Sequence, residues 1–555
     1  METRIMQADI LVIGGGSAGC MAANRAMEIN PALKIVIFEK GDIKYSGSIA
    51  RGMDALNIVA IPNFTTPEFY VESSTLNCYG ILDVPPTYEM ARRSFGLLKK
   101  LEGWGVYFPQ DEKGDYCTLQ YHPVGKFLTA MEEPNLKVMI TEKALGKGAV
   151  AVNRTMGLKL LMDDGRVAGA VGVNVRTGEL VVCLAKAVIL SNGGQARFGL
   201  PNSGHLYGTF DFPGNTGDGY VMGYEAGASL TGMEFLYRVT IIKDLSCPLL
   251  SICVVRGARM LDIFDEILME WTSWDLKKAN AAAGAGRGPL RLRLSHLPPE
   301  KIKEIESILF TTERPVQERF FKRRKIDFRK DDIELWPTEP QICGGHGMAG
   351  LVVNEKAETA VPGLYAGGDV SCVAKGHLTG AFVFGEIAAE EAARFVASQP
   401  TPKLDSGQVK EIQKTIEKRT AQADKWVDVR DIEYKVRRLI NDYLTSPKNA
   451  YKLNRWLEWA DVFERELNED VAVRNGHELV KTFEVGNIVK CATFSAKAAL
   501  ERKESRSGYP HQRIDYPEQD DNNWLCHVDV RRGKDGEVTV CKRPLIRNLP
   551  SGGAL

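Results

Sequence analysis

The sequence has no excess of either charge and no closely spaced cysteines. Its 71 Lys and Arg residues equal its 71 Asp and Glu residues, so no general polycation is available and we expect no nucleic-acid partner. Its 11 cysteines are scattered, and no two are separated by only two residues. This spacing excludes a ferredoxin-type iron–sulfur motif within the chain, and we predict no metal site and mostly buried, reduced thiols.

Long hydrophobic runs are also missing. The longest strongly apolar run, residues 247–255, is far below the roughly 18 residues that span a bilayer, and Arg256 ends it. The amino terminus passes directly into a strand pattern, without the features of a secretory signal. We therefore expect a cytoplasmic protein, and peripheral association with a membrane or a larger redox complex stays open.

The amino-terminal residues carry a strand, turn, helix, strand pattern. Residues 9–13 form a short apolar run, residues 14–19 read Gly-Gly-Gly-Ser-Ala-Gly, and residues 20–28 have helical apolar spacing. A second strand pattern at 34–38 ends at Glu39, where a carboxylate accepts hydrogen bonds from ribose hydroxyls. This combination predicts a dinucleotide-binding βαβ unit, although the motif alone does not choose between NAD and FAD.

Each glycine of this turn has a mechanical role. Gly14 permits the turn, Gly16 lets the backbone approach a pyrophosphate, and Gly19 lets the helix pack close to the strand. The helix N-terminus then faces the phosphates. We include Ser17 and Ala18, which lie between Gly16 and Gly19 in the turn, among the predicted cofactor-binding residues.

Three later segments add related patterns. Residues 187–194 read as a buried strand that ends at Gly193 and Gly194, and residues 215–219 open a helix. Residues 363–369 form another strand that ends in an acid, Asp369, followed by a helix from about 379 to 397. In this order, the segments resemble the flavoproteins of the fumarate reductase and succinate dehydrogenase superfamily, over most of the chain.

The resemblance implies FAD rather than NAD. It implies that Glu39 holds the adenosine ribose, that the Gly193–Gly194 turn packs against the cofactor and that Asp369 reaches the ribityl chain. Many members attach FAD through a histidine that the stretch 44–48 lacks, so we expect non-covalent FAD; an ordinary surface loop is the alternative for this stretch. The remaining expected cofactor-binding residues are Lys40, Ser46, Gly47 and Asp218.

The resemblance also implies an α/β fold, with a discontinuous Rossmann-like FAD-binding domain, an inserted α+β capping domain and a helical bundle. The alanine- and glycine-rich stretch 281–288 reads as a loop within the cap. Residues 516–524, with Trp524, resemble the C-terminal signature of the superfamily and favour a folded extension. The expected domains are residues 1–235 with 341–400 (FAD), 236–340 (cap), 401–505 (helical bundle) and 506–555 (C-terminal extension).

Reduction of a C=C bond needs hydride delivery, a proton donor and cations that hold carboxylates. Arg256 is the best match to the arginine that serves as proton donor in fumarate reductases, and a structural arginine is the alternative. The two histidines of that family are missing from residues 234–240 and at Pro340. Where a carboxylate-binding arginine would follow, Lys375 and His377 are the nearest basic residues.

Three segments resemble instead the alpha chain of dissimilatory adenylylsulfate reductase, which works with a ferredoxin-like iron–sulfur partner. They are residues 52–57, 337–346 and 523–537. This resemblance implies that Asn57 and His346 orient substrate and stabilise charge. The alternatives are an ordinary turn asparagine and a packed histidine in a glycine-rich turn.

One position departs from the adenylylsulfate enzymes. Their cap arginine is replaced here by Ile241, so sulfate recognition would need another cation such as Arg238 or Arg256. Three hypotheses follow: a flavoprotein of the adenylylsulfate reductase type that reduces a small anionic substrate, a fumarate or other enoate reductase, and a flavin protein that only transfers electrons. In each, a separate iron–sulfur protein is the expected electron partner.

Overall fold

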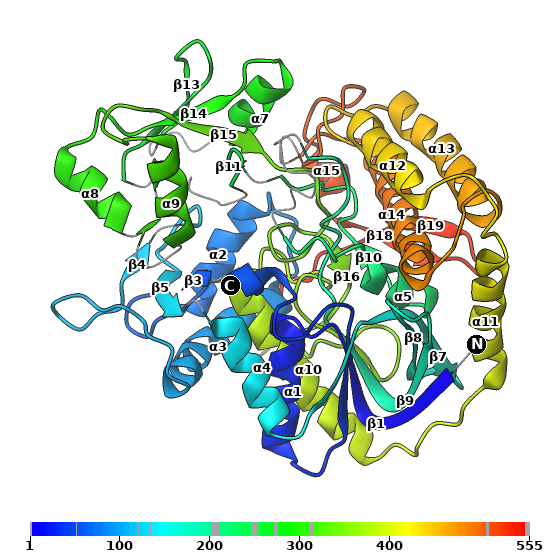
Figure 1. Cartoon of the computed structure of the whole chain (residues 1–555). Helices are drawn as coiled ribbons and strands as arrows, with labels where there is room; N and C mark the ends of the chain where they lie inside the picture. Colours follow the sequence, from blue (N-terminus) through cyan, green and yellow to red (C-terminus); the bar gives the residue numbers. More distant parts are fainter. Residues whose placement is uncertain are drawn as a thin grey trace.

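The computed structural model describes most of the chain, and Figure 1 shows its layers. A central sheet carries blue and yellow-green helices, a green capping layer projects at upper left, and yellow to orange helices stand at the right. Of the segments singled out above, residues 52, 239, 247–252 and 255 lie outside the described part. The described residues are 3–51, 53–119, 121–133, 135–201, 211–238, 240–245, 253–254, 256–270, 276–307, 309–310, 315–506 and 510–549.

The central sheet contains strands from two separated parts of the sequence, as predicted. Its order is β6-β2-β1-β9-β8-β7, and β17 pairs with β9. The pairs β1–β2, β1–β9, β2–β6 and β17–β9 are parallel, whereas β7–β8 and β8–β9 are antiparallel. The strands are β1 (Thr3–Ile13), β2 (Ile35–Glu39), β6 (Val150–Asn153), β7 (Thr155–Asp163), β8 (Arg166–Asn174), β9 (Leu180–Leu190) and β17 (Leu364–Ala366).

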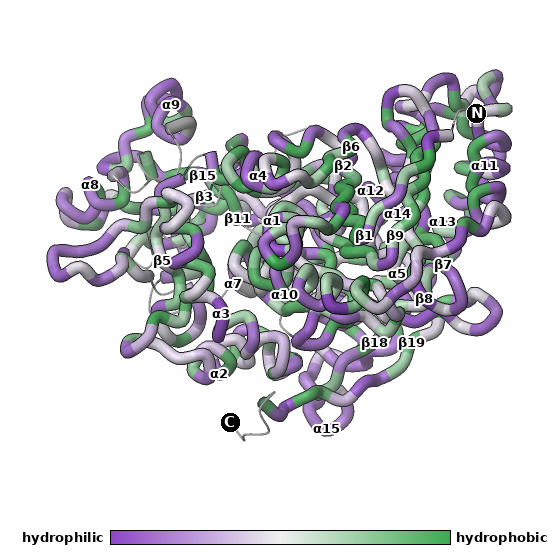
Figure 2. The backbone as a smooth tube through the Cα atoms, turned by 90° about the horizontal axis from the view of Figure 1, so that it is seen from below, coloured by the Kyte–Doolittle hydropathy of each residue, from purple (hydrophilic) through white to green (hydrophobic). Residues whose placement is uncertain are grey.

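Burial explains why β1 lies in the centre of this sheet. Its first five residues are exposed or partly buried, whereas its last four residues, Ile10 to Ile13, are buried on both faces between two parallel neighbours. Figure 2 shows the hydrophobic residues gathered along β1 and β9. Helices α1 (Ser17–Ile29), α4 (Leu136–Gly146) and α10 (His377–Ala397) pack together beside the sheet. The Cβ of an alanine at Gly385 would lie 2.4 Å from the Ala18 carbonyl oxygen, so α1 and α10 approach closely there.

Smaller elements surround this core. Strands β10 (Leu230–Thr231), β16 (Gly350–Leu351), β18 (His527–Arg532) and β19 (Val538–Arg543) form a four-stranded sheet, so the C-terminal residues join a sheet with mid-chain strands. Helix α5 (Asp218–Glu225) packs on β7. The remaining elements of the first half are η1 (Ser48–Arg51), β3 (Met53–Leu56), α2 (Pro67–Asn77), α3 (Val84–Gly103), β4 (Thr118–Leu119) and β5 (Leu128–Glu133), and β3, β4 and β5 form a third sheet.

The capping layer has its own sheet and its own hydrophobic core. The sheet order is β11-β15-β14-β12-β13. The prediction of a loop at 281–288 is wrong for its first half, because α7 continues to Gly284; alanine is the best helix former and outweighs the neighbouring glycine. The elements are β11 (Thr240–Ile242), β12 (Arg259–Leu261), β13 (Ile267–Met269), α7 (Leu276–Gly284), β14 (Leu290–Arg293), α8 (Pro299–Ser307), α9 (Pro315–Arg324) and β15 (Ile333–Pro337).

Four long helices form the predicted bundle. Each begins at an Asp or Asn whose side chain accepts a hydrogen bond from a backbone N–H group of the first turn. The short helix α15 (Asp521–Trp524) precedes β18 in the C-terminal extension. The bundle contains α11 (Ser406–Thr420), α12 (Val429–Tyr443), α13 (Ala450–Glu469) and α14 (Gly476–Glu501).

Across the described ranges, we find no helix whose length and apolar character would let it cross a membrane.

Candidate functional site

The glycine-rich turn between β1 and α1 has the geometry that its sequence predicts. Gly14 has a φ of +101°, which favours glycine, and a Cβ at Gly19 would lie 2.0 Å from the Gly14 carbonyl oxygen. Glu39, at the end of β2, is buried and accepts hydrogen bonds from the backbone N–H groups of Gly15 (2.9 Å) and Gly41 (2.6 Å). The acid and the turn are therefore held together.

The surroundings of this turn fit an FAD diphosphate and ribose. A Cβ built on Gly16 meets no protein atom closer than 3.9 Å, so the protein leaves room at the turn. The loop after β2 reaches the same place, because a Cβ on Gly47, whose φ is +87°, would lie 3.3 Å from the Gly16 Cα atom. Ser46 is 3% exposed, and its hydroxyl oxygen has no hydrogen-bond partner among the described residues. A buried hydroxyl without a partner is suited to a bound polar group.

Lys40 and Asp218, two further predicted cofactor residues, contact each other. The Lys40 ammonium lies 2.7 Å from Asp218 and 3.1 Å from Glu484 of α14, and it donates to the Thr216 hydroxyl (3.0 Å). Glu484 also pairs with Arg197. These side chains form a buried ion cluster that joins the loop after β2 to the helical bundle.

The Gly193–Gly194 turn packs against protein atoms. A Cβ on Gly193 would lie 2.4 Å from the Asn215 side-chain nitrogen, and one on Gly194 would lie 2.7 Å from the Ile342 carbonyl oxygen. The turn therefore joins the end of β9 to the start of the segment that returns from the cap.

Asp369 follows β17 and lies beside the predicted active-site histidine segment. A Cβ on Gly345 would lie 1.9 Å from an Asp369 carboxylate oxygen, so the acid lies directly against the backbone next to His346. Burial, and then the negative charge of Asp211, raise the pKa of Asp369 to about 7. Asp211 lies 4.0 Å from His346 Nε2, so the two acids and the histidine are neighbours.

His346 belongs to a cluster of aromatic and basic side chains that we call the histidine cluster; its members are Tyr121, His122, Tyr237, His346, Lys375 and His377. Its Nδ1 atom lies 3.1 Å from Nδ1 of His377, the first residue of α10. Its ring stacks on Tyr237 with centroids 5.8 Å apart. The Lys375 ammonium lies 5.4 Å from the centroid of Tyr237. The turn that leads into α10 holds this arrangement, since Lys375 and His377 both have positive φ values, +53° and +49°.

Asn57 meets the same cluster through another histidine. The His122 Nε2 atom lies 2.9 Å from the Asn57 carbonyl oxygen, and the His122 ring is 6.1 Å from that of His377. Tyr121 contacts both rings edge-on. The structure therefore brings the predicted residues Asn57 and His346 together around His122 and His377.

Burial decides the charge state of this cluster. It lowers the pKa of His122 to about 4 and that of His377 well below its usual value, so both imidazoles are neutral at pH 7. Burial also lowers the pKa of Lys375. His122 Nδ1 and His377 Nε2 are buried, and neither has a hydrogen-bond partner in the described part of the chain. A ligand oxygen can accept a hydrogen bond from His377 Nε2, whereas His122, which donates from Nε2 to the Asn57 carbonyl, offers Nδ1 as an acceptor for a ligand N–H or O–H group.

Arg256 lies in the capping layer. Its Nε atom is 2.9 Å from Glu304 on α8, and its side chain is 9% exposed. Arg256, the predicted proton donor, therefore contacts another residue of the cap, whereas Asn57 and His346 lie at the histidine cluster. Ile241, which stands in the place of the cap arginine, is fully buried in β11.

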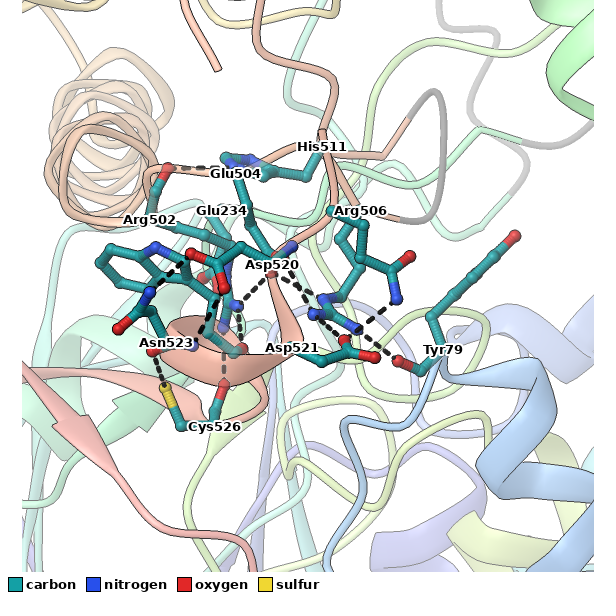
Figure 3. A network of polar contacts seen from close by, with 12 residues as sticks. Tyr79, Glu234, Arg502, Glu504, Arg506, His511, Asp520, Asp521, Asn523 and Cys526 are labelled. Atoms are coloured by element: carbon teal, nitrogen blue, oxygen red, sulfur yellow. Dashed lines mark hydrogen bonds and ion pairs between the residues drawn. The ribbon is translucent and has the colours of Figure 1, made fainter. Parts of the chain in front are cut away.

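The C-terminal extension is attached to the cap entrance by a buried ion network (Figure 3). Arg502 contacts Glu234 (2.8 Å) and Glu504 (2.8 Å), and all three side chains are fully buried. Arg506 adds contacts with Glu504 (2.6 Å), Asp521 (2.6 Å) and the Tyr79 carbonyl oxygen (2.9 Å). The folded extension expected around the C-terminal signature is present, and its charges hold it to the segment that enters the cap.

Sequence reasoning missed His122 and Asp211 and did not assign His377 to the site. The Tyr121-His122 pair carries no motif, and Asp211 is distant from His346 in sequence. Only His377 had a usable signal, because it lies a few residues beyond Asp369 at the start of a predicted helix.

Known proteins share both the fold and the sequence pattern. A model described as an FAD binding domain matches residues 9–239, and a model described as the fumarate reductase flavoprotein C-terminus matches residues 435–550. Together they match more than half of the chain.

Relatives extend this similarity over nearly the whole chain. An uncharacterized FAD-dependent oxidoreductase of Methanocaldococcus jannaschii is 28% identical over 95% of this chain and 97% of its own. One component of the CoM/CoB fumarate reductase of Methanothermobacter marburgensis is 26% identical over 93% of this chain and 96% of its own. The structure of adenylylsulfate reductase from Archaeoglobus fulgidus has a TM-score of 0.88 and 26% identity, covering 98% of this chain and 96% of that one. The chain is an FAD-dependent oxidoreductase and belongs to the fumarate reductase and succinate dehydrogenase flavoprotein superfamily.

Proposed function

We propose that this protein is the FAD component of a two-protein reductase of the adenylylsulfate reductase type, and that it reduces a small anionic substrate at the histidine cluster. The observation that carries the proposal is the convergence of His122, His346, His377 and Lys375 beside Asn57. When bound, FAD supplies two-electron chemistry at its isoalloxazine ring. Non-covalent FAD, with Glu39 at the ribose, Ser46 and Gly47 at the turn and Asp369 near the ribityl chain, is part of the proposal.

Different side chains of the histidine cluster have different roles in binding the substrate. Lys375 attracts the anion, and His377 Nε2, which has no protein partner among the described residues, can donate a hydrogen bond to it. His346 is oriented by the Tyr237 ring on one face and by His377 at Nδ1. Tyr121 and Tyr237 exclude water from the rings, which strengthens each polar contact. One lysine with neutral imidazoles suits a single oxyanion, whereas fixing two carboxylates calls for further cations.

Electrons must enter from another protein under this proposal. The sequence has no cysteine spacing for an iron–sulfur cluster, and the ten described cysteines are free. The relative from Methanothermobacter is named as one part of a larger enzyme. We propose a ferredoxin-like iron–sulfur protein as the donor. Rapid reduction of the flavin in the purified chain by NADH alone would contradict the proposal of a separate electron donor.

Anaerobic stopped-flow absorbance tests the substrate. The FAD-loaded chain is reduced with dithionite, freed of excess reductant and mixed separately with adenylylsulfate, fumarate and crotonate. We expect adenylylsulfate to reoxidise the flavin with release of AMP, and fumarate and crotonate to have no effect. Reoxidation by fumarate alone would contradict the proposal and favour fumarate or enoate reduction, the second candidate. No response to any of the three would favour a flavoprotein that only transfers electrons.

Fumarate or enoate reduction is the second candidate. The family model matched at residues 435–550 and the position of Arg256 favour it. It requires the Arg256 guanidinium, whose Nε atom contacts Glu304, to act on the substrate, so an Arg256→Lys variant separates the two functions. The variant should abolish reduction of an enoate but leave reduction of a sulfur oxyanion within about threefold, since lysine keeps the charge and loses the guanidinium fork.

A further inference from the structure

Lys137 is a buried lysine that contacts the glycine-rich turn from the side of α4. It is 2% exposed. Its ammonium donates hydrogen bonds to the carbonyl oxygen of Gly15 and to the Thr141 hydroxyl (3.1 Å), and lies 3.4 Å from the Cys20 sulfur. No sequence motif singled out this residue, because α4 begins more than a hundred residues after the turn.

No carboxylate in the described ranges lies within ion-pair distance of the Lys137 ammonium, although the residue is only 2% exposed. Burial of an unpaired ammonium costs several kcal/mol unless other groups compensate it. A buried cation kept beside a dinucleotide turn therefore points to an anion on the other side of that turn.

The peptide between Gly15 and Gly16 connects the two sides. A peptide unit is planar, and its C=O and N–H groups are the two ends of one dipole. Lys137 binds the carbonyl of Gly15, whereas the N–H at the other end of the same unit belongs to Gly16, the N-cap residue of α1. The preceding N–H group, that of Gly15, is already bound by Glu39. Gly16 thus offers the first N–H of the helix N-terminus that has no hydrogen-bond partner among the residues the structure describes.

We infer that Lys137 strengthens FAD binding by polarising the Gly15–Gly16 peptide, so that the Gly16 N–H group becomes a stronger donor to the FAD diphosphate. A cation on the carbonyl oxygen draws electron density away from the N–H group, as in any polarised hydrogen-bonded chain. Lys137 is a positioning residue in this role, because it acts through the peptide and not by touching the cofactor. The inference holds whichever substrate the enzyme reduces.

Equilibrium binding to the FAD-free full-length chain tests the inference. Dissociation constants are measured for FAD by flavin fluorescence, and for ADP and adenosine by calorimetry. Two variants are compared: Lys137→Met removes the charge and the donor, whereas Lys137→Gln removes the charge and keeps a donor for the Gly15 carbonyl. Lys143→Met is the matched control, since it removes a lysine from the same helix that lies over the Trp104 ring.

We expect both Lys137 variants to bind FAD and ADP about tenfold more weakly, the loss associated with a hydrogen bond to a charged partner. Adenosine, which has no diphosphate, should bind all four proteins equally, and the control should bind FAD like the wild type. Unchanged FAD affinity in Lys137→Gln would overturn the inference. So would an equal loss for ADP and adenosine, which would show a disturbed fold. If Lys137→Met does not fold, Lys137→Gln alone decides.

Discussion

The Nδ1 atom of His377 lies 3.1 Å from the Nδ1 atom of His346, so the two rings adopt opposite tautomers when both are neutral. A neutral imidazole has one donor and one acceptor nitrogen, and a hydrogen bond between two Nδ1 atoms needs one of each. The proton on one ring therefore fixes the proton on the other. Any ligand that accepts a hydrogen bond from His377 Nε2 makes His346 the donor at Nδ1.

Replacement of His377 tests this coupling. In His377→Phe, His346 loses the partner that selects its tautomer, and the rate of flavin reoxidation by the substrate should fall about 10- to 100-fold. Stopped-flow absorbance measures this rate. The exposed His477, changed to Phe, is the control, and an unchanged reoxidation rate in His377→Phe would contradict the coupling.

Asp369 should make the stability of the FAD-free protein depend on pH. Its pKa in the folded chain is raised from 3.8 to about 7 by burial and by Asp211, so the folded state holds a proton that the unfolded state releases. This contribution is fully present below pH 3.8 and is lost as the pH rises through about 7. Over that window, the unfolding free energy of the wild type should fall relative to Asp369→Asn by about 2 kcal/mol, allowing for partial solvent screening. Urea unfolding at several pH values measures the difference in unfolding free energy between the two proteins. This difference should not change with pH if Asp369 is ionised at every pH tested.

The flavin should leave the protein on denaturation. The loop at Lys44 to Ser48 has no histidine, the residue through which the resemblance described above implies covalent attachment of FAD. After acid precipitation of the yellow protein, FAD absorbance should appear in the supernatant and the pellet should be colourless. Yellow colour that stays with the pellet would show a covalent bond elsewhere.

Removal of Glu484 should cost stability more than cofactor affinity. Burial favours its protonated form, but Lys40 and Arg197 outweigh burial and lower its pKa to about 2. In Glu484→Gln these buried cations lose a partner, and the unfolding free energy should fall by about 3 kcal/mol. The FAD dissociation constant should change by less than about threefold.

Exposed Glu411 on α11, which pairs with Lys159, supplies the control for Glu484→Gln. Glu411→Gln should lower stability by no more than about 1 kcal/mol. A large loss of FAD affinity in Glu484→Gln, with little loss of stability, would instead favour Lys40 and Asp218 as direct cofactor residues.

Local patterns predicted the first part of the fold because its signals lie close together in sequence. The strand before Gly14, the helix after it and Glu39 are all present, as is the return of the chain at β17. Long-range contacts could not be predicted in this way. Lys40 meets Glu484 across 444 residues, and His122 meets Asn57 across 65, without any spacing that marks either pair.

The stretch at 281–288 shows a different reason for failure. Alanine and glycine occur there together, and the glycines favour a loop. The alanines continue α7 to Gly284, because helix propensity is a sum over several residues and one glycine costs only about 1 kcal/mol.

The ion pair between Glu234 and Arg502 also affects when this region of the chain can fold during synthesis. These residues are 268 positions apart, and both side chains are completely buried. A ribosome exposes Glu234 long before it adds Arg502, so a chain that ends before residue 502 lacks the arginine that contacts this buried carboxylate. Folding of that region must wait for the carboxyl-terminal part of the chain. Chains released early should therefore be recognised by chaperones and proteases as incomplete.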